Sequence, residues 1–228
     1  PLSDLSRILD AARRDRYLVP GAEISIEANP GTVDGAKLSG LLGLGVNRLS
    51  LGIQSFDDAE LQLLGRIHST AEALDAFRVA RDAGFRNISL DLIFGLPGQS
   101  LASWRASLHR ALDLAPEHLS LYALSVEAST PLATAIERGA LPRPDPDLAA
   151  DMYELAQQTC AAAGYLHYEI SNWARQASMR CEHNLIYWRN EDYVGLGAGA
   201  HSWARGRRRA NVTAPSEYTA LLSRGASP

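Results

Sequence analysis

Four polar side chains lie at or just after the predicted ends of buried strands, where their chemistry suits a small charged ligand. Glu27, Gln54 and Asp91 each interrupt a strand-like apolar run, and Arg66 follows in a connecting segment. A lone carboxylate or amide is costly to bury, so such a group normally has a partner or a ligand. In parallel α/β folds, ligands bind at the carboxyl ends of the strands. These residues therefore outline a candidate site.

Two interpretations of the four residues remain open at this level. They could form an internal polar network that holds the strands together. Alternatively, they could recognise a zwitterionic ligand that carries a ribose. Arginine binds a carboxylate through two parallel hydrogen bonds, and Glu, Gln and Asp side chains can take ribose hydroxyls and an ammonium group.

The elements that would position these residues follow a repeating strand–helix pattern. Residues 45–51 and 84–90 are near copies, each beginning with glycine and running into a predicted strand. Such a repeat predicts parallel strands joined by crossover helices. We expect strands that are apolar on both faces, as parallel sheets covered by helices require. The predicted strands are residues 23–28, 47–53, 87–94 and 118–125, and the predicted helices are residues 2–16, 34–42, 57–64, 69–83 and 100–113.

Four strands are too few for a closed barrel, so residues 1–128 are predicted to form part of an α/β barrel or an open sheet. A proline-rich stretch, including Pro131 and residues 141–147, then predicts a linker. Residues 129–228 are expected to form a smaller α+β extension. Its predicted elements are a helix over 147–163, a strand over 165–170 and a last helix near 215–224.

The composition limits the class of protein. The chain has 228 residues, 46% of them hydrophobic, and a net charge of −4, which argues against nucleic acid as the main partner. The basic run at 205–209 is expected to be a solvated loop. No run is long and apolar enough for a transmembrane segment. Two cysteines are too few for a disulfide framework and favour a reducing compartment, here the cytoplasm. The chain begins with Pro1, so we expect a segment of a longer protein.

Several motifs resemble one family. They are Glu-Ala-Asn-Pro-Gly-Thr at 27–32, Asn-Arg-Leu-Ser-Leu-Gly-Ile-Gln-Ser-Phe at 47–56, Gly-Arg-x-His at 65–68 and Asp-Leu-Ile-x-Gly-Leu-Pro-Gly-Gln at 91–99. Together they are similar to the radical S-adenosylmethionine family of oxygen-independent coproporphyrinogen III oxidases, with a closer match to its HemW haem-chaperone branch. The resemblance covers essentially the whole chain. It implies that Glu27, Gln54, Arg66 and Asp91 contact S-adenosylmethionine.

One family motif is missing from the chain. The resemblance implies a [4Fe–4S] cluster held by Cys-x-x-x-Cys-x-x-Cys, but Cys160 and Cys181 do not match this spacing. We therefore expect no metal ligands in this chain and cluster ligands outside it. Cys160 is expected to be a buried small residue and Cys181 a loop thiol.

A second candidate site is His183-Asn184-Leu185-Ile186-Tyr187-Trp188, which the resemblance associates with haem binding. Imidazole is a common ligand of haem iron, and Tyr187, Trp188 and Trp173 are expected to supply an apolar wall. The glycines at 195–199 lack the strand and acidic residue of a dinucleotide-binding unit. We assign no role to His201.

The resemblance implies a haem chaperone that binds haem or porphyrin and passes it to haem-accepting proteins. The first alternative is an oxygen-independent coproporphyrinogen III oxidase of porphyrin biosynthesis. The second is a degenerate barrel without a ligand. The oligomeric state does not follow from the sequence.

Overall fold

The computed structural model describes residues 1–14 and 18–228, which form two compact units, Pro1–Arg180 and Cys181–Pro228. The predicted end of the first helix, Arg16, lies outside the described residues. The elements of the first unit are α1 (Leu2–Arg14), β1 (Ser25–Ala28), α2 (Gly35–Gly43), β2 (Arg48–Gln54), α3 (Asp58–Leu63), α4 (Thr70–Ala83), β3 (Ile88–Phe94), α5 (Leu101–Asp113), β4 (His118–Ala123), α6 (Pro131–Glu137), α7 (Pro146–Ala162), β5 (Leu166–Glu169), β6 (Asn172–Ala174) and the 3₁₀ turn η1 (Ala177–Met179).

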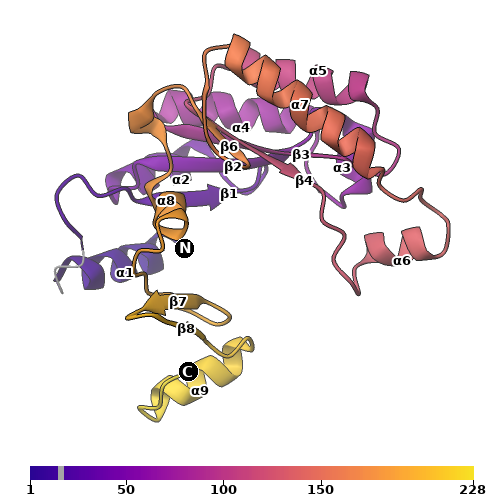
Figure 1. The fold of residues 1–228 in the computed structure, drawn as a ribbon. Coiled ribbons are helices and arrows are strands. Elements are labelled where there is room, and N and C mark those ends of the chain that lie inside the picture. Colours follow the sequence, from indigo (N-terminus) through magenta and orange to yellow (C-terminus); the bar gives the residue numbers. More distant parts are fainter. Residues whose placement is uncertain (15–17) are drawn as a thin grey trace. The chain divides into compact units, whose positions relative to one another are not determined.

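A six-stranded sheet in the order β1-β2-β3-β4-β6-β5 organises the first unit. The first four strands are parallel, which confirms the prediction from the strand–helix repeat. Strand β6 adds antiparallel to β4, and β5 adds antiparallel to β6. Figure 1 shows α4, α5 and α7 on one face of this mixed sheet.

The two faces of the parallel strands differ in character, so the expectation of strands apolar on both faces is wrong. Toward the helices, β2, β3 and β4 present leucine, isoleucine and phenylalanine, which pack with Trp104, Met152 and Cys160 in one core. Successive side chains of a strand point to opposite faces. The other face therefore carries the alternate residues, most of them polar: Arg48, Ser50, Ser89, Asp91, His118 and Ser120.

Local signals in the sequence explain where the crossover helices begin and end. Ser69 caps α4 in a capping box with Glu72, and Gly84 ends the helix in the left-handed conformation at a φ of 112°. The residues around Pro131 are not a linker as predicted, because Thr130 caps α6 and Pro131 takes its first turn. Proline is favoured there because its missing N–H would have no helical partner.

The structure divides the chain at residue 180, not at the expected boundary after residue 128. Residues 129–180 continue the first unit because β6 pairs with β4 and α7 packs on α5. A hydrogen bond of 2.9 Å from Trp104 Nε1 to the carbonyl of Met152 joins those two helices. The second unit contains α8 (Glu182–Trp188), the hairpin of β7 (His201–Ala204) and β8 (Arg207–Ala210), and α9 (Pro215–Ser223).

Within the second unit, the basic run lies in the hairpin and not in a loop. Residues 207–210 form β8, and all of its side chains are exposed, as expected of a solvated run. No helix in the described residues is long and apolar enough to cross a membrane.

Candidate functional site

The four predicted site residues line one cavity of about 370 Å³ in the first unit. Glu27, Gln54 and Asp91 come from β1, β2 and β3, and Arg66 comes from the connection between α3 and α4. Tyr122 and Ser125, at and beyond the carboxyl end of β4, complete the polar part of the lining. The predicted shared cavity is confirmed. Its volume lies in the range of small-molecule sites, about 300–1,000 Å³.

Asp91 lies where several hydroxyl groups converge. Ser50 Oγ is 2.9 Å from each carboxylate oxygen of Asp91, and Ser89 Oγ is 3.2 Å from Oδ1. Burial raises the pKa of Asp91, while hydrogen bonds from Ser50, Ser120 and Ser89 and the charge of Arg48 oppose this rise. These donors are the means by which a largely enclosed carboxylate can stay ionised and accept further hydrogen bonds.

Arg66 has binding capacity that the described residues do not use. Its Nη1 is 3.4 Å from Asn29 Oδ1, and its Nε is buried without a hydrogen-bond partner. No carboxylate in the described part of the chain forms a salt bridge with it. A buried, unpaired donor is costly, and a guanidinium is built to bind a carboxylate through two donors. Arg66 therefore fits the carboxylate of a ligand.

Gln54 reaches the cavity through an unusual backbone conformation. Its φ is 70°, and the pairing of β2 with β3 shifts register between Leu51 and Gln54. Left-handed backbone at a residue other than glycine is uncommon and often occurs at functional sites. Gly52 provides the space for this arrangement, because a Cβ there would lie 2.8 Å from Gln54 Nε2 and 3.1 Å from Asn29 Oδ1.

The sequence interpretation missed several residues of this site. Asn29 and Gly52 line an adjoining cavity together with the four predicted residues. Both lie inside the quoted motifs, Asn29 in Glu-Ala-Asn-Pro-Gly-Thr and Gly52 just before Gln54. Ser50 was also missed, although the alternation of Arg48, Ser50 and Gly52 with leucines could have marked this face of β2 as polar.

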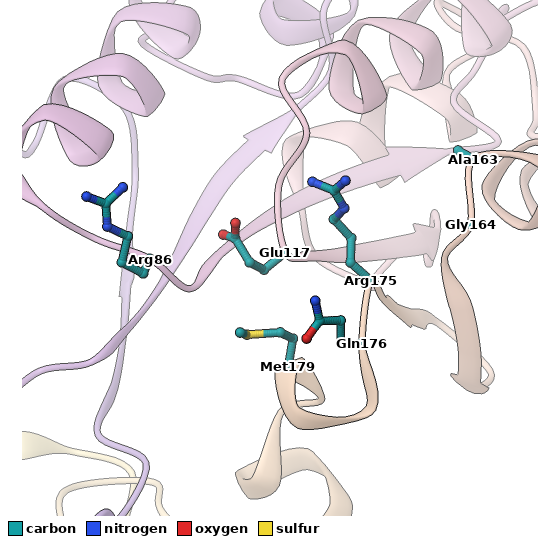
Figure 2. A pocket seen from close by; sticks show the side chains of 7 residues that line it. All are labelled: Arg86, Glu117, Ala163, Gly164, Arg175, Gln176 and Met179. Carbon is teal, nitrogen blue, oxygen red and sulfur yellow. The ribbon is translucent and has the colours of Figure 1, made fainter.

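Another cavity of the first unit, of about 500 Å³, contains none of the predicted residues (Figure 2). Its acidic lining residue, Glu117, is already engaged, with Arg81 Nη2 at 2.8 Å and the backbone N–H of Ile88 at 3.0 Å. The arginines that line it, Arg86 and Arg175, are exposed. Unlike the cavity that Arg66 lines, this cavity has no described lining side chain with a buried, unpaired hydrogen-bonding atom.

In the second unit, helix α8 presents His183 and Tyr187 to each other. Their spacing of four residues places them on one helix face, and Tyr187 Oη lies 2.8 Å from His183 Nε2. The Tyr187 ring also contacts the Tyr193 ring edge to face at 4.6 Å. Trp188 is half exposed. The expectation that Trp173 adds to this wall is wrong, because its ring is fully buried in the first unit and stacks on His167 at 4.4 Å.

The cysteines lie as expected from their lack of a cluster motif. Cys160, on α7, is buried in the core, and burial raises its pKa to about 12. Cys181 precedes the first residue of α8, and neither cysteine forms a disulfide.

Comparison with known proteins identifies the family of the chain. Residues 1–111 match the Radical SAM superfamily model, and many relatives align over most of the chain. The chain belongs to the radical S-adenosylmethionine superfamily. It is 42% identical to heme chaperone HemW of Bacillus subtilis over 98% of this chain and 59% of that protein. It is 43% identical to heme chaperone HemW of Escherichia coli over 86% of this chain and 51% of that protein. The chain thus spans between half and three fifths of these two relatives.

A solved member of the superfamily has the same architecture. The structure of coproporphyrinogen III oxidase (HemN) from Escherichia coli superposes on 100% of this chain and 55% of that protein, with a TM-score of 0.81 at 24% identity. At this identity the similarity establishes the fold alone.

Proposed function

We propose that the intact protein is a radical S-adenosylmethionine haem chaperone of the HemW type, which binds haem and passes it to haem-accepting proteins. Curated HemW relatives at 37–44% identity support this function. The observation that carries the cofactor part is Arg66, a half-buried arginine whose buried Nε is unpaired, beside carboxylate and amide side chains.

S-adenosylmethionine suits this cavity because its charged groups and its ribose have counterparts there. We assign its carboxylate to Arg66, since a guanidinium forms paired, charge-assisted hydrogen bonds with carboxylates. Glu27, Gln54 and Asp91 supply acceptors for its ammonium group and its ribose hydroxyls. The sulfonium charge also favours a cavity with two carboxylates.

The [4Fe–4S] cluster of the superfamily would supply an electron to S-adenosylmethionine when bound. We place its ligands outside these 228 residues, because the chain has no Cys-x-x-x-Cys-x-x-Cys. In the described residues, no three His, Cys, Asp or Glu side chains gather as a metal-binding group. The contribution of this chain is therefore to bind and orient the cofactor and to exclude water from it.

For haem we propose His183 as the contact, on an exposed helix face that also carries Tyr187. The hydrogen bond of 2.8 Å between them fixes the imidazole ring. Such a partner orients an iron ligand and tunes its basicity. We also propose a reducing compartment, the cytoplasm, for the protein, in line with two cysteines that form no disulfide.

One assay with two readouts separates the chaperone from the rival oxidase. The intact, reconstituted protein is incubated with haem and, separately, with coproporphyrinogen III, reductant and S-adenosylmethionine. We expect stoichiometric haem binding and no protoporphyrinogen. Steady conversion of coproporphyrinogen III would overturn the chaperone function in favour of the oxidase. Failure to bind either haem or S-adenosylmethionine would instead support the degenerate barrel.

The haem contact is tested by His183→Ala in the intact protein. The matched control is His201→Ala, because His201 is also an exposed histidine of the second unit. We expect weaker haem retention or a shifted Soret band for His183→Ala alone. Equal haem affinity and equal spectra in both variants would remove His183 from the site.

A further inference from the structure

A chain of hydrogen bonds runs from Asp91 on β3 to His118 on β4 and Tyr168 on β5. Ser89 Oγ is 3.2 Å from Asp91 Oδ1 and 2.8 Å from His118 Nδ1. On the other side of the imidazole, His118 Nε2 is 2.8 Å from the hydroxyl of Tyr168. Ser89 and His118 are fully buried and Tyr168 is half-buried. None of these three residues lines the cavity that Asp91 shares with Arg66.

The chemistry of the groups gives this chain one direction. An ionised carboxylate only accepts hydrogen bonds, so the single hydroxyl proton of Ser89 goes to Asp91. Ser89 Oγ must then accept from His118, which requires the proton of a neutral imidazole to sit on Nδ1. The lone pair left on Nε2 accepts from Tyr168. Burial, followed by the charge of Arg48, holds the pKa of His118 well below its usual value, which keeps the ring neutral.

We propose that His118 and Tyr168 are positioning residues for Asp91, and that they act through Ser89 as a one-way hydrogen-bond chain that keeps its carboxylate an oriented acceptor. Tyr168 fixes the tautomer of His118. This tautomer prevents Ser89 from turning its proton away from Asp91. The effect on the cofactor rests on the proposed S-adenosylmethionine site.

Other groups near Asp91 also act on its carboxylate and stay in place when the chain is altered. Ser50 and Ser120 donate to the same carboxylate, and Ser120 Oγ lies 3.3 Å from Ser89 Oγ. The ionisable groups around the chain are Arg48 on β2, Glu27 on β1, Arg66 after α3, Tyr122 on β4, Glu169 on β5 and Arg180, which lies over the Tyr168 ring. Tyr168→Phe leaves all of them in place and removes one hydroxyl.

The first test measures S-adenosylmethionine affinity of the intact protein against pH. Tyr168→Phe should move the acidic midpoint of the profile upward by about half to one pH unit, since a hydrogen bond is lost from the chain that holds the carboxylate ionised. Below the midpoint, affinity should fall about three- to tenfold, and at higher pH it should approach that of the wild type. A merely structural defect would lower affinity at every pH.

Tyr165→Phe is the matched control. Tyr165 is also a buried tyrosine of the first unit, but its hydroxyl donates to the carbonyl of Pro116 at 2.6 Å and has no link to Asp91. We expect a wild-type pH profile for Tyr165→Phe. Equal profiles for Tyr168→Phe and Tyr165→Phe would overturn the proposal.

The second test does not depend on the ligand. Long-range proton–nitrogen NMR of histidine-labelled protein identifies which ring nitrogen of His118 carries the proton. We expect a neutral ring protonated at Nδ1, and protonation at Nε2 would overturn the chain. If S-adenosylmethionine binding fails while the Nδ1 form is found, the cofactor assignment is wrong and the hydrogen-bond chain stands.

Discussion

Replacing Gly52 with alanine should impair the cofactor site while leaving the fold intact. The new Cβ would lie 2.8 Å from Gln54 Nε2 and 3.1 Å from Asn29 Oδ1. Ordinary contact is about 3.5–4.0 Å, so the glutamine amide would have to move by roughly 0.7 Å. The backbone of Gln54 is held at a φ of 70°, which limits how it can yield. Misplacing these two polar groups should cost about 1–2 kcal/mol, or roughly five- to thirtyfold in affinity.

The assay is calorimetric titration of the intact protein with S-adenosylmethionine, accompanied by denaturant unfolding. Gly52 does not have a positive φ, so alanine is compatible with its backbone and the free energy of unfolding should change little. The matched control is Gly43→Ala at the end of α2, where an added Cβ would meet nothing within 4 Å. Affinity of Gly52→Ala within twofold of the wild type would refute the reasoning.

Two further predictions concern charge. Arg66→Lys keeps the charge but loses the paired donors, so this variant should bind S-adenosylmethionine about tenfold more weakly than the wild type. The control variant Arg105→Lys, on the exposed side of α5, should bind it with wild-type affinity. Equal affinities of the two variants would contradict the carboxylate assignment. His118→Gln tests the lowered pKa of His118. Below pH about 6.5 the histidine of the unfolded chain binds a proton and the buried histidine of the folded chain does not, so the wild type loses up to about 1.4 kcal/mol of stability per pH unit. The destabilisation caused by the substitution, measured by urea unfolding, should therefore shrink between pH 7 and 5. A destabilisation independent of pH would contradict the neutral, buried imidazole.

Local sequence signals predicted much of the first unit because they act over a few residues. The Ser69–Glu72 capping box, the glycine at position 84 and the repeated strand–helix units each specify a helix end or a parallel pair by themselves. The four residues that share the cavity were predicted for a related reason. A charged or amide group inside an apolar strand is conspicuous, and the carboxyl ends of parallel strands meet at one edge.

The missed features depend on partners that are distant in the sequence. Asn29 matters because it meets Gly52 of the neighbouring strand and the Arg66 guanidinium, which spacing alone does not reveal. The boundary was placed too early because β6 returns to pair with β4 after a long connection. Helix α8 was missed because its aromatic residues resemble those of an irregular segment.

The polar face of the sheet was recognisable in the sequence and was misjudged. His118 and Ser120 alternate with leucines in β4, as Ser89 and Asp91 alternate with leucines in β3. Which of these polar groups form hydrogen bonds with one another across β2, β3 and β4 depends on the register of the strands. That register brings Ser50, Ser89 and His118 to Asp91.

The most direct test of the central claim is a crystal structure of the intact protein with S-adenosylmethionine bound. The account predicts the carboxylate of the ligand on Arg66, and its ammonium and ribose groups among Glu27, Gln54 and Asp91. A ligand bound elsewhere, with the Arg66 guanidinium paired only to protein groups, would contradict it.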